Sequence, residues 1–479
     1  MPERNQIIDD LRGICMLGVI GIHVGSFVLE APYPNSFLYM LLEILSRYSV
    51  PAFFFISGYG LFCQYRPETT IAYLPFLKKR LQSVGLPYVI WSLFYLLYFS
   101  AVMPGCINWQ PANILFLLFY GLSCYHLYFM VILLWFYFTF PLWHKLFSFF
   151  QNSNLKLGFM LLFLLQIVFN YWTCHPNLKS TDLPVFLQNL FNYRLNYLPL
   201  HYLFIFMSGG LAAVYYNTFI KFIIRHFTKV SVFYIFTLLF IGGSYYYYYF
   251  YHNSSLIILV NTLQQLSLQG FLYTIGSLIF FCAVFAKTSL SNPIRKFIHL
   301  LSVNSLIVYL IHPFWMDIIS RLCHVGGIVM TSKKILLIYC LLVTLSVLSS
   351  IIITKLGGKL PWLGLLLTGK RTTSTKKSIL KIQDAFYFHF ILSSQTIYKN
   401  QILLYNCFYY NYYFIICCVC RVKGLLLLWN VKISHPDLAL SLFLQAVLSA
   451  LVTYGVFHLL QACTEAPLSY LSIYFSCSF

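Results

Sequence analysis

Apolar runs of membrane-spanning length recur along this 479-residue chain, and they constrain its fold more than any other feature. Hydrophobic residues make up 60% of the chain and charged residues only 9%, whereas a soluble domain carries about a quarter charged residues. A helix needs about 20 mainly apolar residues to cross a bilayer. The sequence therefore predicts an all-α, polytopic bundle of membrane-spanning helices. We expect about ten core spans, at residues 13–30, 38–63, 83–103, 125–144, 157–174, 198–217, 231–251, 268–286, 300–320 and 335–355.

The last part of the chain differs in composition from the rest. A polar, basic break (RTTSTKKSILK) begins at Arg371, and the later stretches 402–429 and 438–461 are again apolar enough to span. We therefore predict a ten-span domain at residues 1–370 and a tail at residues 371–479. The tail either adds two spans or is an appended segment with no shared function.

The net charge of +20 could suggest a nucleic-acid partner. Most basic residues lie in short loops between apolar runs, where Lys and Arg orient spans, so we expect no nucleic-acid partner. If the N-terminus is cytoplasmic, the cytoplasmic loops carry more Lys and Arg than the outer loops. This asymmetry predicts that both ends of the ten-span core are cytoplasmic. The opening segment MPERNQIIDDLRG is too polar for a signal peptide, so we expect the first span to be retained.

The 14 cysteines do not indicate a disulfide framework or a metal site. They are scattered, mostly within apolar segments, as buried thiols are. Cys417, Cys418 and Cys420 cluster, but no His or Cys lies at zinc-finger spacing from them. We therefore expect no metal cofactor.

Arg12 and His23 are the most informative pair of polar residues, because both belong to the first apolar segment. Eleven helical steps of about 100° bring the second side chain roughly 20° past three full turns, onto the same face. The same steps separate the two residues by about 16 Å along the axis. With Arg12 at the cytoplasmic surface, His23 lies near the bilayer midplane, where an ionisable residue is costly and indicates a functional site.

Six segments, in order along the chain, resemble the signatures of the integral-membrane acyltransferase family 3, whose members O-acylate surface sugars. The first segment contains an acidic residue, followed by an Arg and a His with ten residues between them. The resemblance extends over residues 5–370 and is strongest to members acting on exopolysaccharides and enterobacterial-type surface glycans. The segments are IDDLRGICMLGVIGIH, VPAFFFISGYGLF, FLKKRLQSVGLPYVIW, YHLYFMVILLWFYFTFP, FMSGGLAAVYY and SLIVYLIHPFW.

The resemblance implies an O-acyltransferase that moves an acetyl or succinyl group from cytoplasmic acyl-CoA (acetyl-CoA or succinyl-CoA) to a hydroxyl of a cell-surface or lipid-linked polysaccharide. It also implies a multi-pass protein of a bacterial-type plasma (inner) membrane. An imidazole titrates at about pH 6.5, which suits His23 to general-base catalysis. The guanidinium of Arg12 is a planar fork that suits the phosphates of the donor.

Four further residues are expected to assist this pair. Asp9 precedes Arg12 by three residues and can orient its guanidinium through an i,i+3 contact. Lys79 and Arg80 are candidates for further phosphate contacts, and His312, in the Tyr-Leu-Ile-His-Pro element, is a candidate supporting residue. The oligomeric state is not indicated by the sequence.

The chain departs from the family pattern at two places. Asp9-Asp10 stands where the family has an acidic residue and a glycine before the Arg. The family's basic segment commonly has a second Arg three residues after the first, but Ser83 follows Arg80 at that distance. We therefore expect one phosphate contact to be missing, or to be supplied by Lys78 or Lys79.

Each candidate also has a purely structural interpretation. Arg12 could be an anchor whose side chain snorkels to the surface. Lys78, Lys79 and Arg80 could serve only as topology signals. His23 could be a core histidine bonded to a neighbouring carbonyl.

The remaining polar residues of the spans also have structural interpretations. His312 precedes Pro313, which frees a backbone carbonyl that the imidazole could satisfy. His126 is expected at the interface, near the outer edge of the fourth span. Glu43 could be either the partner of a buried cation or an interfacial anchor. Ser57 and Gly58 form a small pair that permits close helix packing.

Two other classes of membrane protein are alternatives to an enzyme. A polysaccharide exporter or flippase would also have many spans and intramembrane charges. The sequence nevertheless has no inverted repeat and few intramembrane acidic residues. A sensory or scaffold protein would leave the buried His23 unexplained.

Overall fold

A computed structural model describes residues 5–174, 184–288 and 292–370 of the chain, and the predicted tail at 371–479 lies outside them. Within the described residues the secondary structure is helical, with no strand. Contacts divide the chain into two units, and the described part of the second is the segment 333–340 of one helix. The described part of the first unit comprises residues 5–174, 184–288, 292–332 and 341–370. The predicted all-α class is confirmed.

Among the described residues, eight helices are long and apolar enough to cross a membrane, and the number is ten if each of two pairs of bent helices counts as one span. Each of them overlaps one of the ten spans expected from the sequence. The elements in these candidate spans are α1 (Gln6–Val24), α2 (Ser26–Leu29), α3 (Ser36–Tyr39), η1 (Met40–Ile44), α4 (Ser49–Gln64), α5 (Tyr73–Arg80), η2 (Leu81–Gly85), α6 (Leu86–Val102), α8 (Tyr128–Phe138), α9 (Phe140–Asn152), α10 (Leu155–Cys174), η4 (Pro199–Tyr202), α13 (Leu203–Val214), α14 (Tyr216–Arg225), α15 (Phe227–Tyr246), η5 (Tyr247–Tyr251), α17 (Leu268–Lys287), α18 (Asn292–Val325) and α19 (Ser332–Lys359).

Shorter helices connect the spans. The apolar α7 occupies ten residues of the stretch 104–124, which is too few to cross a bilayer. It ends at Gly121, whose positive φ of 69° is a left-handed conformation that glycine adopts readily. These connecting helices are α7 (Pro111–Tyr120), α11 (Val185–Asn192), α12 (Arg194–Tyr197), α16 (Leu256–Thr262) and α20 (Pro361–Thr368).

The first helix begins earlier than the apolar pattern predicts, because Asn5 caps it. The Asn5 side chain accepts hydrogen bonds from the backbone N–H groups of Ile7 and Ile8, at 3.0 and 3.4 Å. The polar segment before the apolar run is therefore helical. Arg12 and His23 consequently belong to one continuous helix, α1, as their shared face requires.

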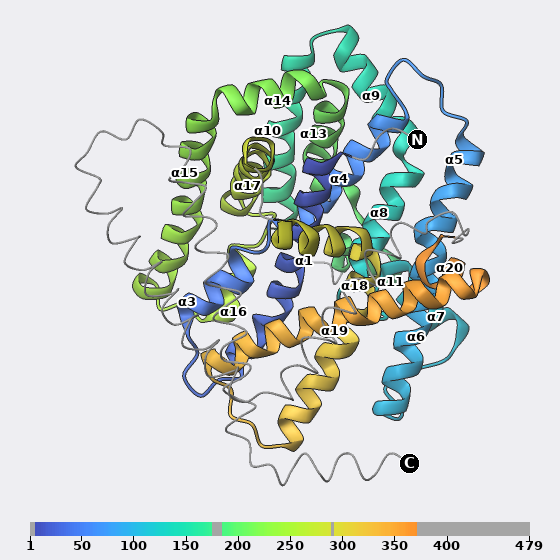
Figure 1. Cartoon of the computed structure of the whole chain (residues 1–479), viewed down its shortest axis with the longest axis vertical. Helices are drawn as coiled ribbons and strands as arrows, with labels where there is room; N and C mark the ends of the chain where they lie inside the picture. Colours follow the sequence, from blue (N-terminus) through green and yellow to red (C-terminus); the bar gives the residue numbers. More distant parts are fainter. Residues whose placement is uncertain (1–4, 175–183, 289–291, 371–479) are drawn as a thin grey trace. The chain divides into compact units, whose positions relative to one another are not determined.

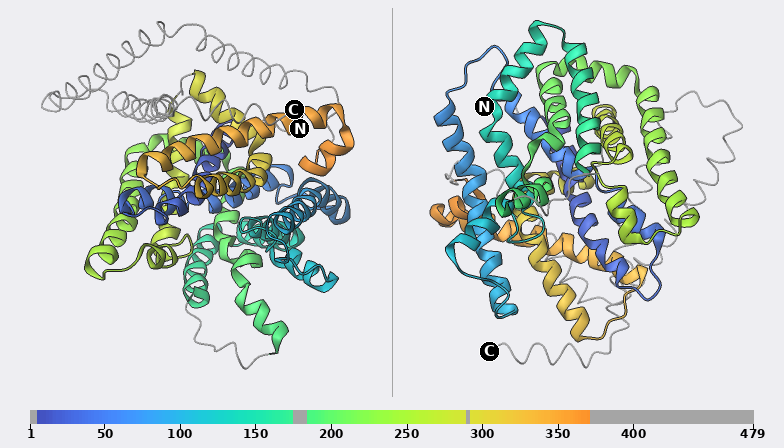
Figure 2. Two further views of the ribbon diagram at one scale, coloured as in Figure 1. Left: turned by 90° about the horizontal axis from the view of Figure 1, so that it is seen from below. Right: turned by 180° about the vertical axis from the view of Figure 1, so that it is seen from behind.

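Helix α1 packs along α18, the longest helix described (Figures 1 and 2). Gly13 makes this approach possible, since a Cβ atom there would collide with the backbone carbonyl of Ile298. A second close pair is formed by α4 and α13, where a Cβ on Gly58 would collide with the carbonyl of Phe206. The packing role predicted for Gly58 is therefore confirmed.

Two breaks in helical structure bring polar residues into the centre of the first unit. The candidate span Ser36–Gln64 is interrupted between η1 and α4, where residues 45–48 form turns. Residues 121–127 form the connection between α7 and α8. Both breaks contribute side chains to the cavity described next.

Candidate functional site

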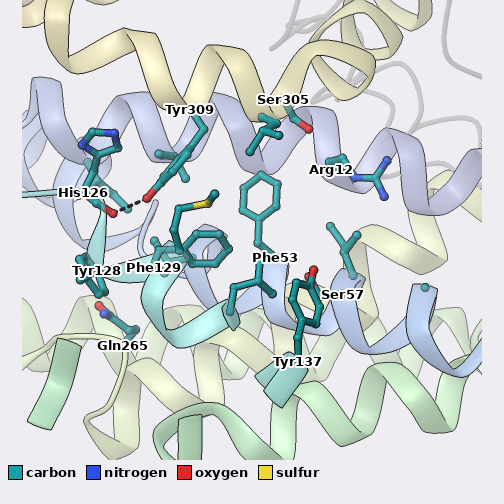
Figure 3. Close-up of a pocket in the computed structure, with 18 of the residues that line it drawn as sticks. Arg12, Phe53, Ser57, His126, Tyr128, Phe129, Tyr137, Gln265, Ser305 and Tyr309 are labelled. Carbon is teal, nitrogen blue, oxygen red and sulfur yellow. Dashed lines mark hydrogen bonds between the residues drawn. The ribbon is translucent and has the colours of Figure 1, made fainter. Parts of the chain in front are cut away.

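A cavity of about 350 Å³ lies among α1, α4, α8 and α18, within the range typical of small-molecule sites. Figure 3 shows Arg12 at one end of it, and His126, Tyr128 and Gln265 at the other. Apolar side chains such as Phe53 line the region between the two ends. The cavity therefore joins the two kinds of residue that the sequence singled out, cations and a histidine.

Arg12 lines the first end of the cavity. Its Nη1 donates a hydrogen bond to the Asp9 carboxylate at 2.9 Å, which is the i,i+3 contact expected from the sequence. The Ser302 hydroxyl of α18 donates to the same carboxylate at 3.4 Å. Asp9 is buried and thus holds the guanidinium of Arg12 in place from the side of α18.

Arg80 also lines the cavity, at the end of α5. Its Nη2 donates to the side-chain oxygen of Gln64 at 2.9 Å, and the guanidinium lies 5.5 Å from the ring centroids of both Phe76 and Tyr137. No carboxylate pairs with Arg80 among the residues that the structure describes. Lys79, its neighbour, is exposed and does not line the cavity.

His23 belongs to a cluster of three imidazoles contributed by three different elements. It stacks on His312 of α18 with ring centroids 5.1 Å apart and an interplanar angle of 27°. His126, just before α8, packs edge-on against His312 at 5.4 Å. Tyr125 covers His23 from another direction at 4.8 Å. His23 and His126 line the cavity, whereas His312 is fully buried behind them.

The hydrogen bond of His312 defines which nitrogen of its ring is free. Its Nδ1 lies 3.2 Å from the backbone oxygen of Val308. A carbonyl can only accept, so Nδ1 of the neutral ring carries the proton and Nε2 keeps its lone pair. Nε2 of His312 and both ring nitrogens of His126 are buried and have no hydrogen-bond partner among the described residues. His312 thus contacts the local backbone at the carbonyl of Val308, whereas the carbonyl that Pro313 frees is that of Tyr309, and this contact leaves one nitrogen available.

Arg47 lies near the histidine end of the cavity, in the break between η1 and α4. Its Nη2 is ion-paired with Glu43, one helical turn earlier, and its Nη1 donates to Gln265 Oε1 at 3.0 Å. Gln265 in turn donates to the Tyr202 hydroxyl at 3.2 Å. Of the two interpretations open for Glu43, the structure supports the partner of a buried cation.

The structure thus gathers most of the residues predicted from the sequence around one cavity. His23, Arg12 and Arg80 line it, and Asp9 and His312 contact these residues directly. Two basic residues that line the cavity were not predicted to belong to a site. His126 was expected at the interface but is only 2% exposed. Arg47 was not singled out, although its i,i+4 spacing from Glu43 was the available signal.

The cavity is not arranged as a metal centre. Among the residues that the structure describes, no group of three or more His, Cys, Asp or Glu side chains is placed to hold a metal ion. Instead, the ring of His312 packs against the rings of both His23 and His126.

Comparison with known proteins gives one match. A family model described as an acyltransferase domain, that of acyltransferase family 3, matches residues 5–355. No curated protein and no solved structure matches the chain significantly. The matched range contains every residue of the cavity described above.

Proposed function

The chain belongs to acyltransferase family 3, and we propose that this membrane acyltransferase moves an acyl group from cytoplasmic acyl-CoA to a hydroxyl of a surface or lipid-linked glycan. The observation that carries the proposal is a single cavity with cations at one end and His23 in the histidine cluster at the other. Family membership supports acyl transfer over the polysaccharide exporter and the scaffold, which have no comparable support.

Arg12 and Arg80 are the proposed contacts for the donor phosphates. Guanidinium groups bind phosphate oxygens through paired, charge-assisted hydrogen bonds. Arg80 has no carboxylate partner among the described residues, so its charge is available to an anion. Lys79 would contribute from the exposed surface of the same helix turn. The pantetheine arm would then follow the cavity towards His23, about 16 Å from Arg12 by the helical rise.

His23 is the proposed general base. It takes the proton of the acceptor hydroxyl as the hydroxyl oxygen attacks the thioester carbonyl. A C–O ester bond forms, the C–S bond breaks, and the departing thiolate of CoA takes the proton back from His23. The imidazolium that exists between these steps is faced by the rings of His312 and Tyr125, which stabilise a cation without a carboxylate.

The expected location follows from the same assignment. Acyl-CoA is a cytoplasmic metabolite, so Arg12 and the N-terminus are proposed to face the cytoplasm, across an inner-type plasma membrane. The acceptor would approach His23 from the outer side. The bias of basic residues towards the cytoplasmic loops supports this orientation.

Mass spectrometry of cell-surface glycans tests the proposal. The full chain, His23→Ala and Arg12→Ala are each expressed to equal membrane levels, and glycan O-acylation is measured. We expect acylation with the wild-type chain and its loss with His23→Ala. Equal acylation in all three strains would refute the enzymatic role of the cavity, and preserved acylation with Arg12→Ala alone would refute the donor role of Arg12.

A further inference from the structure

The three arginines that line the cavity differ in how their charges are balanced. Arg12 is paired with Asp9 at 2.9 Å, and the side chain of Arg12 is 29% exposed. Arg80 has no carboxylate partner among the described residues. The side chain of Arg47 is more deeply buried than that of Arg12: it is 17% exposed, and the side chain of its partner Glu43 is 9% exposed. The cavity is therefore cationic at one end and close to neutral at the end where Arg47 lies.

Arg47 lies at the end of the cavity where we place the acyl group, and not at the end where we place the donor phosphates. Arg47 donates to Gln265, and Figure 3 shows Gln265 beside Tyr128 and His126, away from Arg12. Arg47 and His23 both line the cavity. An acyl group whose carbonyl lies at His23 would thus have Arg47 and Glu43 among its surroundings.

We propose that Glu43 neutralises Arg47 and thereby makes this site select an uncharged acyl group, of the acetyl class, over a dicarboxylic one such as succinyl. The inference rests on the proposed function and deepens it. Glu43 and Arg47 are specificity-determining residues, and neither takes part in the transfer of the proton.

The physical reason is competition for one guanidinium. A free arginine in a cavity would bind the terminal carboxylate of a succinyl group through two parallel hydrogen bonds. Here the Glu43 carboxylate accepts from Nη2 and Gln265 accepts from Nη1, so the charge of Arg47 is already compensated, although its Nε has no partner among the described residues. A second carboxylate would bring two like charges to one buried cation, which is unfavourable where the dielectric constant is low. An acetyl group carries no charge and meets no such penalty.

Competition between donors tests the inference directly. The full-length chain is reconstituted in vesicles with an equimolar mixture of acetyl-CoA and succinyl-CoA, and the acyl groups on the glycan are counted by mass spectrometry. We expect the wild type to favour acetyl at least about ten-fold. Glu43→Gln keeps the size of the side chain and frees the charge of Arg47, so we expect it to lower the acetyl-to-succinyl ratio at least five-fold.

Two further variants separate the charge effect from a general disturbance. The double variant Glu43→Gln/Arg47→Gln is neutral again, so the acetyl preference should return. Glu30→Gln, at an exposed acidic residue outside the cavity, is the matched control and should leave the ratio unchanged. A wild type that prefers succinyl, or a ratio that Glu43→Gln leaves unmoved, would overturn the inference.

Binding measurements keep the two proposals distinguishable. Equilibrium affinities of acetyl-CoA and succinyl-CoA for wild type and Glu43→Gln are measured without an acceptor present. If no acyl group is transferred but Glu43→Gln lowers the ratio of acetyl-CoA to succinyl-CoA affinity as predicted, the catalytic proposal fails and the selectivity stands. If transfer occurs and both affinities and product ratios are unaffected by Glu43→Gln, the selectivity fails alone.

Discussion

His23 of α1 stacks on His312 of α18, with ring centroids 5.1 Å apart and an interplanar angle of 27°. The two residues are far apart in sequence, and α1 and α18 are brought together by their close packing at Gly13. The ring of His312 is fixed by its hydrogen bond to the backbone oxygen of Val308. A proposed base thus rests on an aromatic surface whose orientation this hydrogen bond restrains.

The stacking predicts a specific effect of substitutions at His312. His312→Leu preserves much of the volume but removes the aromatic face, so the His23 imidazolium loses its support. A cation–aromatic contact contributes about 0.5–2 kcal/mol, which corresponds to a decrease in kcat of about 2- to 30-fold. The KM for acyl-CoA should stay within about two-fold of wild type, as steady-state kinetics with purified protein will show.

His312→Phe is the matched control for this prediction, because it restores an aromatic face without the ring nitrogens. We expect its kcat to lie closer to wild type than that of His312→Leu. If the leucine and phenylalanine variants lose activity equally, the stack is not what supports His23, and the free Nε2 becomes the relevant feature.

Arg80 and Lys79 are adjacent in sequence but differ in position, which makes them a matched pair for the donor site. Arg80 lines the cavity and Lys79 is exposed. A hydrogen bond to a charged group contributes about 1.5–3 kcal/mol, so Arg80→Gln should raise the KM for acyl-CoA about ten-fold or more. Lys79→Gln should raise it less. A larger effect at Lys79 than at Arg80 would contradict the donor-binding role of this end of the cavity.

Asp9 is predicted to act on donor binding through Arg12, which it contacts at 2.9 Å. Asp9→Asn should therefore raise the KM for acyl-CoA, and Arg12→Gln should raise it more. Because the two residues form one unit, the double variant should be no worse than Arg12→Gln alone. Fully additive effects in this double-mutant cycle would show that Asp9 contributes independently of Arg12.

The contact between α4 and α13 predicts a difference between two glycines of one helix. A Cβ on Gly58 would collide with the backbone of Phe206, whereas a Cβ on Gly60 meets no atom within 4 Å. Overpacking of this kind costs about 1–3 kcal/mol. Gly58→Ala should thus lower the unfolding temperature of the detergent-solubilised protein, while Gly60→Ala should leave it unchanged or raise it slightly. Equal unfolding temperatures would contradict the packing described here.

The ten helical segments could be predicted from the sequence because each is long and apolar enough to stand out by itself. The relation of Arg12 to His23 was also predictable, since both lie on one helix and helical periodicity determines which face they share. The position of the capping residue Asn5 was not, because a single polar residue before an apolar run does not show where the helix begins.

The rest of the site depends on contacts between elements, which periodicity does not encode. His126 lies in the connection before α8, and it is buried by side chains of other elements, such as Tyr95 of α6 and His312 of α18. Arg47 lies in a break within a span, so a continuous helix over residues 38–63 gave no reason to expect it in a cavity. The spacing of Glu43 and Arg47 was visible, but their place in the molecule was not.

The most direct measurement of the central claim is acyl transfer by the purified chain with a substitution at His23. Full-length wild type and His23→Gln, reconstituted in vesicles, are given labelled acetyl-CoA and a glycan acceptor, and the labelled ester is quantified. General-base catalysis contributes about 10²–10⁴-fold, so the variant should transfer acetyl at least about 100-fold more slowly, with its affinity for acetyl-CoA retained. Transfer by His23→Gln within a few-fold of wild type would contradict the account.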